Sequence, residues 1–244
     1  MTHFALLKEL MMLKAAKSFE TGMPILDVSE VIELERRTAE GGTSLLTLMK
    51  RAGAAVAETA AEMLGEGKTP RERIAILAGS GNNGGDGWVA AARLADEGYN
   101  VTLVSKAPAD ALTAEPARTA AMEAAHGNRF KIAVSPVAAE LAQLLSEADL
   151  IIDAVLGTGF AHSEVREPYV EWIDLANTAR NAYNVPILAV DCPSGLNAQT
   201  GSAASSCIDA DKTITMIAAK AGLVQADATA HVGTLLVAPI GVEA

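Results

Sequence analysis

The chain has 244 residues, half of them hydrophobic and 4% aromatic, with a formal net charge of −11 and a pI of about 4.8. This length allows one α/β domain with a large core, and the acidic balance excludes a nucleic-acid partner because phosphate backbones require clustered Lys and Arg. No apolar run approaches the ~20 residues of a membrane span. The cysteines, Cys192 and Cys207, are too few for a disulfide framework and favour a reducing, cytoplasmic location.

Residues 1–24 are expected to form an N-terminal helical extension of a single domain that spans residues 25–244. The first 17 residues are apolar but are interrupted by charges and lack a small-residue cleavage site, so they do not resemble a signal peptide. An oligomer contact or a removable targeting segment are the alternatives for this extension.

Two helices are expected at the start of the domain. Residues 27–30 (Asp-Val-Ser-Glu) have the spacing of a capping box, which predicts a helix that ends at Gly41. Thr43 or Ser44 then caps a second helix, in which apolar residues recur at helical spacing over 45–64.

From residue 73 onward strand and helix patterns alternate, which predicts a parallel, doubly wound sheet with right-handed crossovers. The expected strands lie near 73–78, 101–105, 130–134, 149–155, 186–191, 213–217 and 233–238. The expected helices between them cover 88–97, 114–125, 137–147 and 168–182. Ser135 and Pro136 are expected to begin the third of these helices. No clear helix separates the last two strands, so that region is either irregular or antiparallel.

The segment over 78–98 predicts a strand end, a glycine loop and the start of a helix. The spacing of its glycines matches the dinucleotide fingerprint G-x-G-x-x-G. A dehydrogenase would carry an acid after the next strand, where this chain has Ser105 and Lys106. The loop is therefore expected to hold a nucleotide-like ligand on backbone N–H groups, but not as a dehydrogenase holds NAD. Gly85 is expected to have a positive φ beside the ligand, so that Gly85→Val would impair binding more than folding.

Three loops with polar residues beside glycines are expected at one edge of the sheet. They cover residues 79–87, 153–163 and 191–195, each after a predicted strand. Ligands of doubly wound sheets bind beyond the carboxyl ends of the strands, where the strand order switches. The three loops are therefore interpreted as one site.

These loops resemble the NAD(P)H-hydrate epimerase family, whose domain is of the YjeF N-terminal type. The resemblance covers roughly residues 25–242 and rests on LMKRAG (48–53), GNNGGDG (81–87), DAVLGTG (153–159), VDCPSG (190–195) and AAKAGL (218–223). It implies a three-layer α/β/α Rossmann-like domain, usually a homodimer. It also implies epimerisation, that is, interconversion of the R and S forms of NADHX and NADPHX. These are nicotinamide nucleotides damaged by addition of water at C6, and a dehydratase then repairs the S form. This chain is expected to act beside a separate dehydratase.

The resemblance also implies the site residues. The substrate would be lined by Asn82, Asn83, Gly84, Gly85, Asp86, Gly157, Thr158, Gly159, Phe160, Ala161, His162, Ser163 and Asp191. A potassium ion would be held by Asn83, Asp153 and Ser194, whose oxygen atoms suit a hard cation. Asp191 is the candidate catalytic residue.

Several of these residues also have ordinary structural interpretations. Asp86 could cap the helix expected over 88–97, and Asn83 or Asp191 could simply form a turn. Asp153 could accept hydrogen bonds from loop N–H groups without holding an ion.

Three further residues near these loops are interpreted without a catalytic role or are left open. Cys192 is expected to be buried and inert because no basic neighbour lowers its pKa. His162 is expected on the loop surface, and Lys220 is equally compatible with the site and with solvent.

A chemical route that fits these residues is loss of the C6 hydroxyl with acid help, followed by return of water to either face of the ring. Asp191 would donate and then accept the proton, and its carboxylate would stabilise the ring cation. A ring-opening route also stays open. A NAD(P)-dependent oxidoreductase and a non-catalytic nucleotide-binding or scaffold protein on the same fold are the alternative functions.

Overall fold

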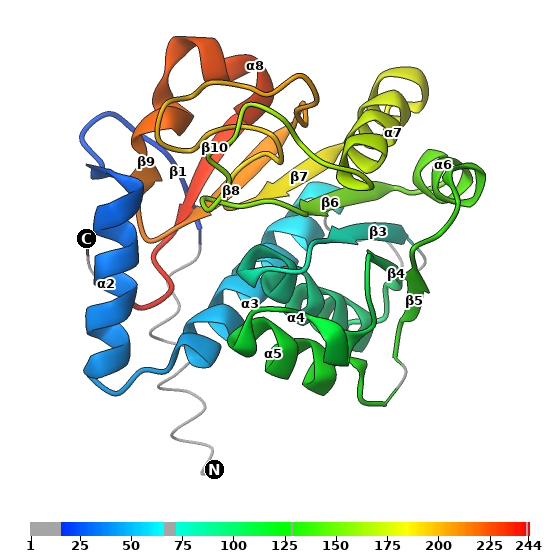
Figure 1. Cartoon of the computed structure of the whole chain (residues 1–244), viewed down its shortest axis with the longest axis horizontal. Helices are drawn as coiled ribbons and strands as arrows, with labels where there is room; N and C mark the ends of the chain where they lie inside the picture. Colours follow the sequence, from blue (N-terminus) through cyan, green and yellow to red (C-terminus); the bar gives the residue numbers. More distant parts are fainter. Residues whose placement is uncertain (1–15, 66–71, 128, 243) are drawn as a thin grey trace.

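A computed structural model describes residues 16–65, 72–127, 129–242 and 244. Its main strands are β1 (Lys17–Ser18), β3 (Arg73–Ala78), β4 (Asn100–Ser105), β5 (Lys131–Val134), β6 (Leu150–Ala154), β7 (Ile187–Val190), β8 (Lys212–Met216) and β10 (Thr234–Ala238). They form one sheet in the order β1-β10-β8-β7-β6-β3-β4-β5 (Figure 1). All neighbours are parallel except β1, which is antiparallel to β10. All seven predicted strands are confirmed.

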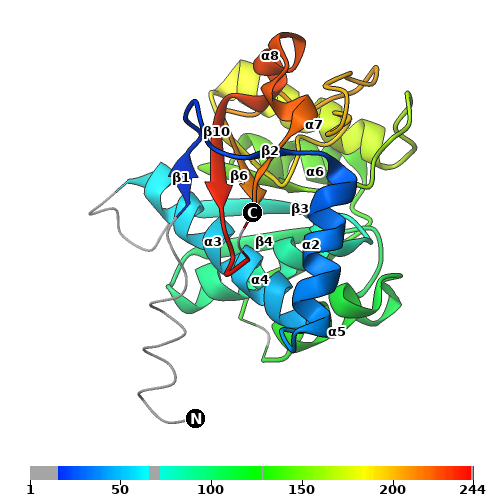
Figure 2. The same ribbon diagram turned by 90° about the vertical axis from the view of Figure 1, so that its left-hand side faces the viewer.

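Helices cover both faces of this sheet. One layer holds α3 (Leu45–Leu64), α4 (Asn82–Asp96) and α5 (Glu115–Ala125), and the other holds α6 (Ala138–Ser146) and α7 (Tyr169–Tyr183). Figure 2 shows α2 (Val28–Glu40) along the side of the molecule, near the first layer. The short elements η1 (Ala109–Ala111), η2 (Ala221–Val224), η3 (Ala226–Ala228) and α8 (Thr229–Val232) complete the connections. The three-layer α/β/α fold is as the sequence predicts.

The core follows the alternation of side chains along the strands. In β3, Ile74 and Ile76 pack with the layer of α3, α4 and α5, whereas Leu77 packs with the layer of α6 and α7. One tryptophan is buried in each layer, Trp88 in α4 and Trp172 in α7. Since both faces of the sheet are covered, its central strands are apolar almost throughout.

The strand order reverses between β3 and β6. The chain passes from β3 to β4 and β5 on one side, then returns to place β6 on the other side of β3. Ala78 and Ala154 are paired at the carboxyl ends of these two strands. The crevice outside this switch point is where a doubly wound sheet binds its ligand.

The glycine-rich segment after β3 is helical, and its prediction as a loop is wrong. Helix α4 begins at Asn82 with Gly81 as N-cap. A Cβ atom at Gly84 would lie 1.9 Å from the carbonyl oxygen of Gly79, and one at Gly87 would lie 2.8 Å from the Cβ of Ala154. These glycines therefore let the first turns of α4 lie directly on the ends of β3 and β6.

The structure corrects one other local prediction and decides between the two alternatives left open for another. Helix α6 begins at Ala138 with Val137 as N-cap, whereas Ser135 has a φ of +46° and donates its hydroxyl to the carbonyl of Lys106. The segment between β8 and β10 is irregular, with only short helical turns, but it brings β10 back parallel to β8. A separate two-stranded parallel sheet, β2 (Ile25–Leu26) with β9 (Ala219–Lys220), was not predicted.

The N-terminal predictions are confirmed within the domain and only partly described before it. The capping box of α2 forms, with the Asp27 N–H donating to Glu30 at 2.8 Å, and Ser44 caps α3. Of the expected helical extension, residues 1–15 lie outside the described residues. In residues 16–24 the structure forms the edge strand β1 and a turn instead of a helix. No helix of the described residues is long and apolar enough to cross a membrane.

Candidate active site

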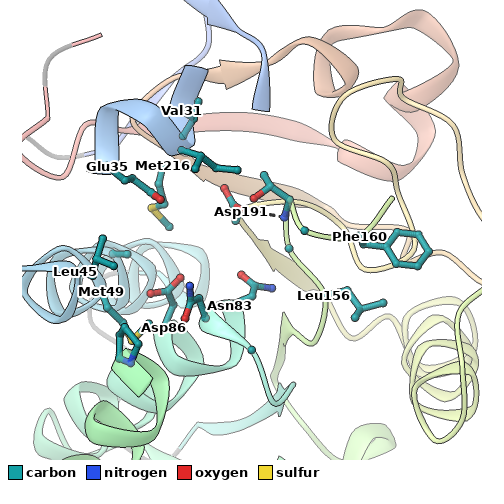
Figure 3. Close-up of a pocket in the computed structure, with 18 of the residues that line it drawn as sticks. Val31, Glu35, Leu45, Met49, Asn83, Asp86, Leu156, Phe160, Asp191 and Met216 are labelled. Carbon is teal, nitrogen blue, oxygen red and sulfur yellow. Dashed lines mark hydrogen bonds between the residues drawn. The ribbon is translucent and has the colours of Figure 1, made fainter. Parts of the chain in front are cut away.

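A cavity of about 550 Å³ lies at the carboxyl ends of the central strands. Apolar side chains of α2 and α3, including Val31 and Met49, form one part of its wall, together with Met216 from the end of β8. Glu35, Asp86, Asp191 and Lys220 supply charged groups to the same cavity. Figure 3 shows Asp191 and Glu35 on one side of the cavity and Asp86 and Asn83 on the other. The cavity is large enough for a nucleotide-sized ligand.

The first predicted loop contributes three of its five expected residues to the cavity. Asn82, Asn83 and Asp86 line it, whereas Gly84 and Gly85 do not. A Cβ atom at Gly85 would lie 2.5 Å from the Sδ of Met49 and 2.9 Å from the Cα of Ala117, so Gly85 is needed where α3, α4 and α5 meet. Its φ is not positive, and the reason given for Gly85 from sequence is wrong.

Asp86 lies inside α4 and does not cap it, which corrects the structural interpretation of this residue. Since helix positions four residues apart share a face, Asp86 and Asn82 are presented to the same side of α4. Both line the cavity. The start of α4 also offers free backbone N–H groups, which favour an anionic ligand.

The second loop brings part of its predicted set to the cavity. Gly157, Thr158, Gly159, Phe160 and His162 line the cavity, whereas Ala161 and Ser163 are exposed and are not among the lining residues. His162 is exposed, as expected, and packs edge-on against Phe160 with 6.1 Å between ring centroids. A Cβ atom at Gly157 would lie 3.2 Å from the Cβ of Asn83 and 3.3 Å from Oδ2 of Asp191. A glycine therefore lets this loop pass close to both neighbouring loops.

Asp191 forms a buried ion pair with Lys220. The Nζ of Lys220, whose side chain is 1% exposed, donates to Oδ1 of Asp191 at 2.6 Å, to Oγ1 of Thr215 at 2.8 Å and to the carbonyl of Met216 at 3.0 Å. The backbone N–H of Thr158 donates to the other carboxylate oxygen at 3.3 Å. Lys220 therefore faces the site, and its ammonium group has three acceptors.

The backbone is strained where this ion pair forms. Asp191 has a φ of +64°, and Ile217, beside Met216 at the end of the next strand, has a φ of +71°. In each case the following N–H bonds to the carbonyl of the preceding residue, at 2.7 Å and 2.8 Å, which makes two tight γ-turns. A β-branched residue such as Ile217 rarely adopts positive φ, so this strain indicates that the surrounding structure holds both strand ends in place.

The acids of the cavity differ in protonation. Burial raises the pKa of Asp86 well above its usual range, and the negative charges of Asp191 and Glu35 raise it further. Burial raises the pKa of Glu35 as well, with a contribution from Asp191. Burial would also raise the pKa of Asp191, but the ammonium of Lys220 and the hydrogen bonds from Lys220 and Thr158 bring it below the ordinary value. At neutral pH Asp191 is therefore ionised, and Asp86 holds its proton more strongly.

Of the residues predicted to hold potassium, Asn83 lines the cavity, whereas Asp153 and Ser194 are not among its lining residues. Asp153 and Ser194 are fully buried, and Asp153 accepts hydrogen bonds from the hydroxyl of Ser194 at 2.6 Å, its N–H at 2.8 Å and the N–H of Val155 at 3.2 Å. These hydrogen-bond donors are neutral, and burial raises the pKa of Asp153 to about 6. The amide of Asn83 is buried with neither its nitrogen nor its oxygen hydrogen-bonded within the described residues. The unsatisfied amide oxygen and the buried carboxylate are donors that fit a hard monovalent cation.

Sequence reasoning missed Glu35 and left Lys220 undecided. The helical spacing could have indicated Glu35. It lies four residues after the buried Val31, so it is an acid on the inward-facing side of α2. Cys192 is buried, and burial raises the pKa of its thiol, which agrees with the expected inert cysteine. No cluster of three or more His, Cys, Asp or Glu side chains that could hold a metal occurs among the described residues.

Together the fold and the site define a Rossmann-like α/β protein with an acid-lined ligand cavity at the switch point of its sheet. Residues 45–222 match the family described as YjeF-related protein N-terminus, and the chain belongs to this family. The resemblance noted from sequence is therefore confirmed.

Similar proteins carry names from nicotinamide nucleotide repair. The chain is 35% identical to a "Bifunctional NAD(P)H-hydrate repair enzyme Nnr" of Thermanaerovibrio acidaminovorans, over 90% of this chain and 41% of that protein. It is 38% identical to a "Bifunctional NAD(P)H-hydrate repair enzyme" of Leishmania major, over 84% of this chain and 34% of that protein. The chain thus spans about two fifths or less of these relatives. An "NAD(P)H-hydrate epimerase" of Cenarchaeum symbiosum is 34% identical over 81% of this chain and 87% of its own length.

The crystal structure of the yeast protein ynu0 has the same fold. It superposes with a TM-score of 0.72 and 21% sequence identity, over 88% of this chain and 87% of the yeast chain. At this identity the similarity concerns the fold alone.

Proposed function

We propose that this chain is an NAD(P)H-hydrate epimerase, which interconverts the R and S forms of NADHX and NADPHX. The proposal depends mainly on one observation. Asp86 and Asp191 line one cavity from different walls, and their surroundings push their pKa values in opposite directions. Pairs of this kind typically divide acid and base roles between them. The name of the Cenarchaeum symbiosum relative supports the choice of reaction.

In this proposal the Asp86 carboxyl protonates the C6 hydroxyl as it leaves the ring. The Asp191 carboxylate stabilises the resulting cation and takes a proton from the water that adds to the other face. In the reverse direction the two groups exchange roles. The structure thus leads us to divide between two carboxyl groups the acid and base roles that sequence reasoning placed on Asp191 alone.

The cavity offers different surroundings to the two ends of such a ligand. Val31, Met49 and Met216 form an apolar part near the charged groups, which suits the nicotinamide ring. The N-terminus of α4 suits the phosphates because its first backbone N–H groups favour anions. The loop over 157–159 lines the same cavity and brings further backbone close to the ligand. Of the predicted substrate residues, we retain as contacts those that line the cavity.

A potassium ion is part of the proposal, held by Asn83, Asp153 and Ser194. The ion would link the start of α4 to the loops that follow β6 and β7, and so support the floor of the cavity. Its test is the replacement of potassium by a bulky quaternary ammonium at constant ionic strength, with thermal stability and ligand affinity as readouts. Potassium should raise both in the parent protein but neither in Asp153→Ala. Equal behaviour of the parent in the two salts would contradict a cation site.

We further propose that the protein is a cytoplasmic homodimer that supplies the S form to a separate dehydratase. Its molar mass by light scattering checks the dimer. Fractionation of the cells that produce it checks the location. Isolation of an active dehydratase from the same cells checks the coupling.

The activity is tested with a mixture of both epimers and a dehydratase specific for the S form. An epimerase drives the whole mixture to the dehydrated nucleotide, whereas a protein without this activity leaves the R half unreacted. A redox change of the nicotinamide would instead favour an oxidoreductase.

A further inference from the structure

Glu35 differs from the other glutamates of α2. Glu30 belongs to the capping box, and Glu33 and Glu40 form ion pairs with arginines on the helix surface. Glu35 lines the cavity, and its carboxyl has no hydrogen-bond or ion-pair partner within the described part of the chain. Figure 3 shows this carboxyl on the side of the cavity where Asp191 lies. A half-buried acid without a partner, in a site that already holds two acids, costs free energy, and acids kept in such surroundings cluster at functional sites.

The helix that carries Glu35 is attached to the segment that carries Lys220. Strand β2, which directly precedes α2, pairs with β9, so that Leu26 lies opposite Lys220. The Gln199 side chain joins the start of α2 to the loop after β7, because it accepts from the N–H of Val28 at 2.9 Å and donates to Asp27 at 2.6 Å. Glu35 is therefore held in a defined position relative to the ion pair.

The charges around Asp86 come from three other elements. Glu35 of α2 and Asp191 after β7 are acids, and Lys220 of β9 is the cation that contacts Asp191. The part of α3 that lines the cavity is apolar, and His162 lies at the exposed loop. Three acids and one lysine therefore share the cavity, and the negative charge of Glu35 favours the protonated form of Asp86.

The proposed epimerisation leaves both catalytic carboxyls in the wrong protonation state. After one passage from R to S, Asp86 has lost its proton and Asp191 has gained one. Another passage in that direction requires Asp191 to release a proton, which Lys220 favours, and Asp86 to regain one. Asp86 and Glu35 are both half-buried and line the cavity, but Asp86 lies on α4 beside the bound ring in this proposal, whereas Glu35 lies on α2 between the cavity and the exposed surface of that helix.

We propose that Glu35 is a third acid–base group of this site, and that it returns a proton from solvent to the Asp86 carboxylate after each turnover. The O–H bond of the Glu35 carboxyl breaks as its proton passes to water in the cavity, and that water releases a proton as an O–H bond forms on Asp86. The Glu35 carboxylate then takes a proton from water or a buffer acid at the surface. This inference rests on the proposed epimerase function. It assigns Glu35 to proton supply and not to substrate binding.

The test is Glu35→Gln, with Glu40→Gln on the same helix as the matched control. Glu35→Gln should lower kcat on the order of tenfold, the lower part of the range for general acid–base groups, and leave KM unchanged. Formate added at constant pH and ionic strength should restore part of kcat in a saturable way, because a small acid replaces the lost proton source. Glu40→Gln should match the parent and show no effect of formate. A kcat for Glu35→Gln equal to that of the parent, or a loss that formate does not restore, would overturn the inference.

A second readout does not depend on activity. The Asp86 carboxyl can be followed by carbon NMR in protein labelled at aspartate, and Glu35→Gln should shift its titration to lower pH because a negative charge has been removed. An unchanged Asp86 titration overturns the coupling between the two residues. Absence of epimerisation in the parent protein, in contrast, overturns the proposed function and is seen before any variant is made.

Discussion

Two aspartates at the ends of neighbouring strands show how one distant residue changes the chemistry of an acid. Asp153 in β6 is fully buried and the Asp191 side chain after β7 is 15% exposed, and each accepts hydrogen bonds from loop groups. Asp153 has only neutral donors, and its pKa rises to about 6. Asp191 has Lys220, from 29 residues further along the chain, and its pKa falls. The first acid ties loops together, whereas the second stays ionised to lower pH at the edge of the cavity.

The comparison predicts that Asp191 carries the chemistry. Asp191→Asn keeps the shape of the side chain but removes the base, so epimerisation should fall by about 10²–10⁴-fold, the usual contribution of such a group. Activity is measured per folded molecule with the coupled dehydratase assay. Asp227→Asn, an exposed change of the same type in η3, should leave the rate unaltered. A near-native rate in Asp191→Asn would remove this residue from the mechanism.

The second prediction removes the residue that distinguishes the two aspartates. Lys220→Met leaves Asp191 enclosed without its counter-charge and should reduce the free energy of unfolding by about 3–5 kcal/mol at neutral pH. In the parent the pKa of Asp191 is lowered, so its stabilisation is present above the unfolded value of about 3.9 and is lost as pH falls. In Lys220→Met burial raises that pKa, so the difference from the parent should shrink as pH falls toward about 4.

Denaturant unfolding between pH 4 and pH 8 measures this effect. The double variant Asp191→Asn with Lys220→Met should be more stable than Lys220→Met alone, because no charge is then left unpaired. A pH-independent loss in Lys220→Met would indicate that packing, and not the ion pair, is what the lysine contributes.

The third prediction concerns Gly85, for which sequence and structure lead to opposite expectations. Gly85→Val would place side-chain atoms against Met49 and the backbone of Ala117, so it should destabilise the fold by about 3 kcal/mol. Gly159→Val is the matched control, because a Cβ there meets nothing within 4 Å. Thermal unfolding of both variants is the measurement. A stable Gly85→Val protein that has lost only ligand binding would support the original sequence interpretation.

The smallest predicted effect concerns Ser194, the neutral hydrogen-bond partner of Asp153. Ser194→Ala removes the 2.6 Å hydrogen bond to Asp153 and should reduce stability by about 1.5–2 kcal/mol, as for other hydrogen bonds to charged groups. Chemical denaturation measures the change, and Ser163→Ala on the exposed loop should have no effect. An equal loss in both variants would show that Asp153 does not depend on Ser194.

Local patterns were sufficient for most of the fold. The strands β3 to β10 of the main sheet were predicted within two residues at each end, because short, mostly continuous apolar runs bounded by turn residues are local signals. The start of α4 was missed because a segment rich in glycine and asparagine is typical of a loop, and nothing in its composition distinguishes it from the first turns of a closely packed helix. What separates the two is the contact of Gly84 with Gly79 and of Gly87 with Ala154. Those contacts exist only once α4 lies on the sheet.

The sequence by itself determined the family, the doubly wound sheet and the three segments at its switch point, because each depends on motifs within a few residues of one another. Only the tertiary structure decided which acids face the cavity and which of them is ionised. Glu35, Asp86, Asp191 and Lys220 lie on four elements spread over 186 positions of the chain. The pKa of a buried acid depends on its desolvation and on charges within a few ångströms. These quantities are set by packing between elements that are distant in sequence.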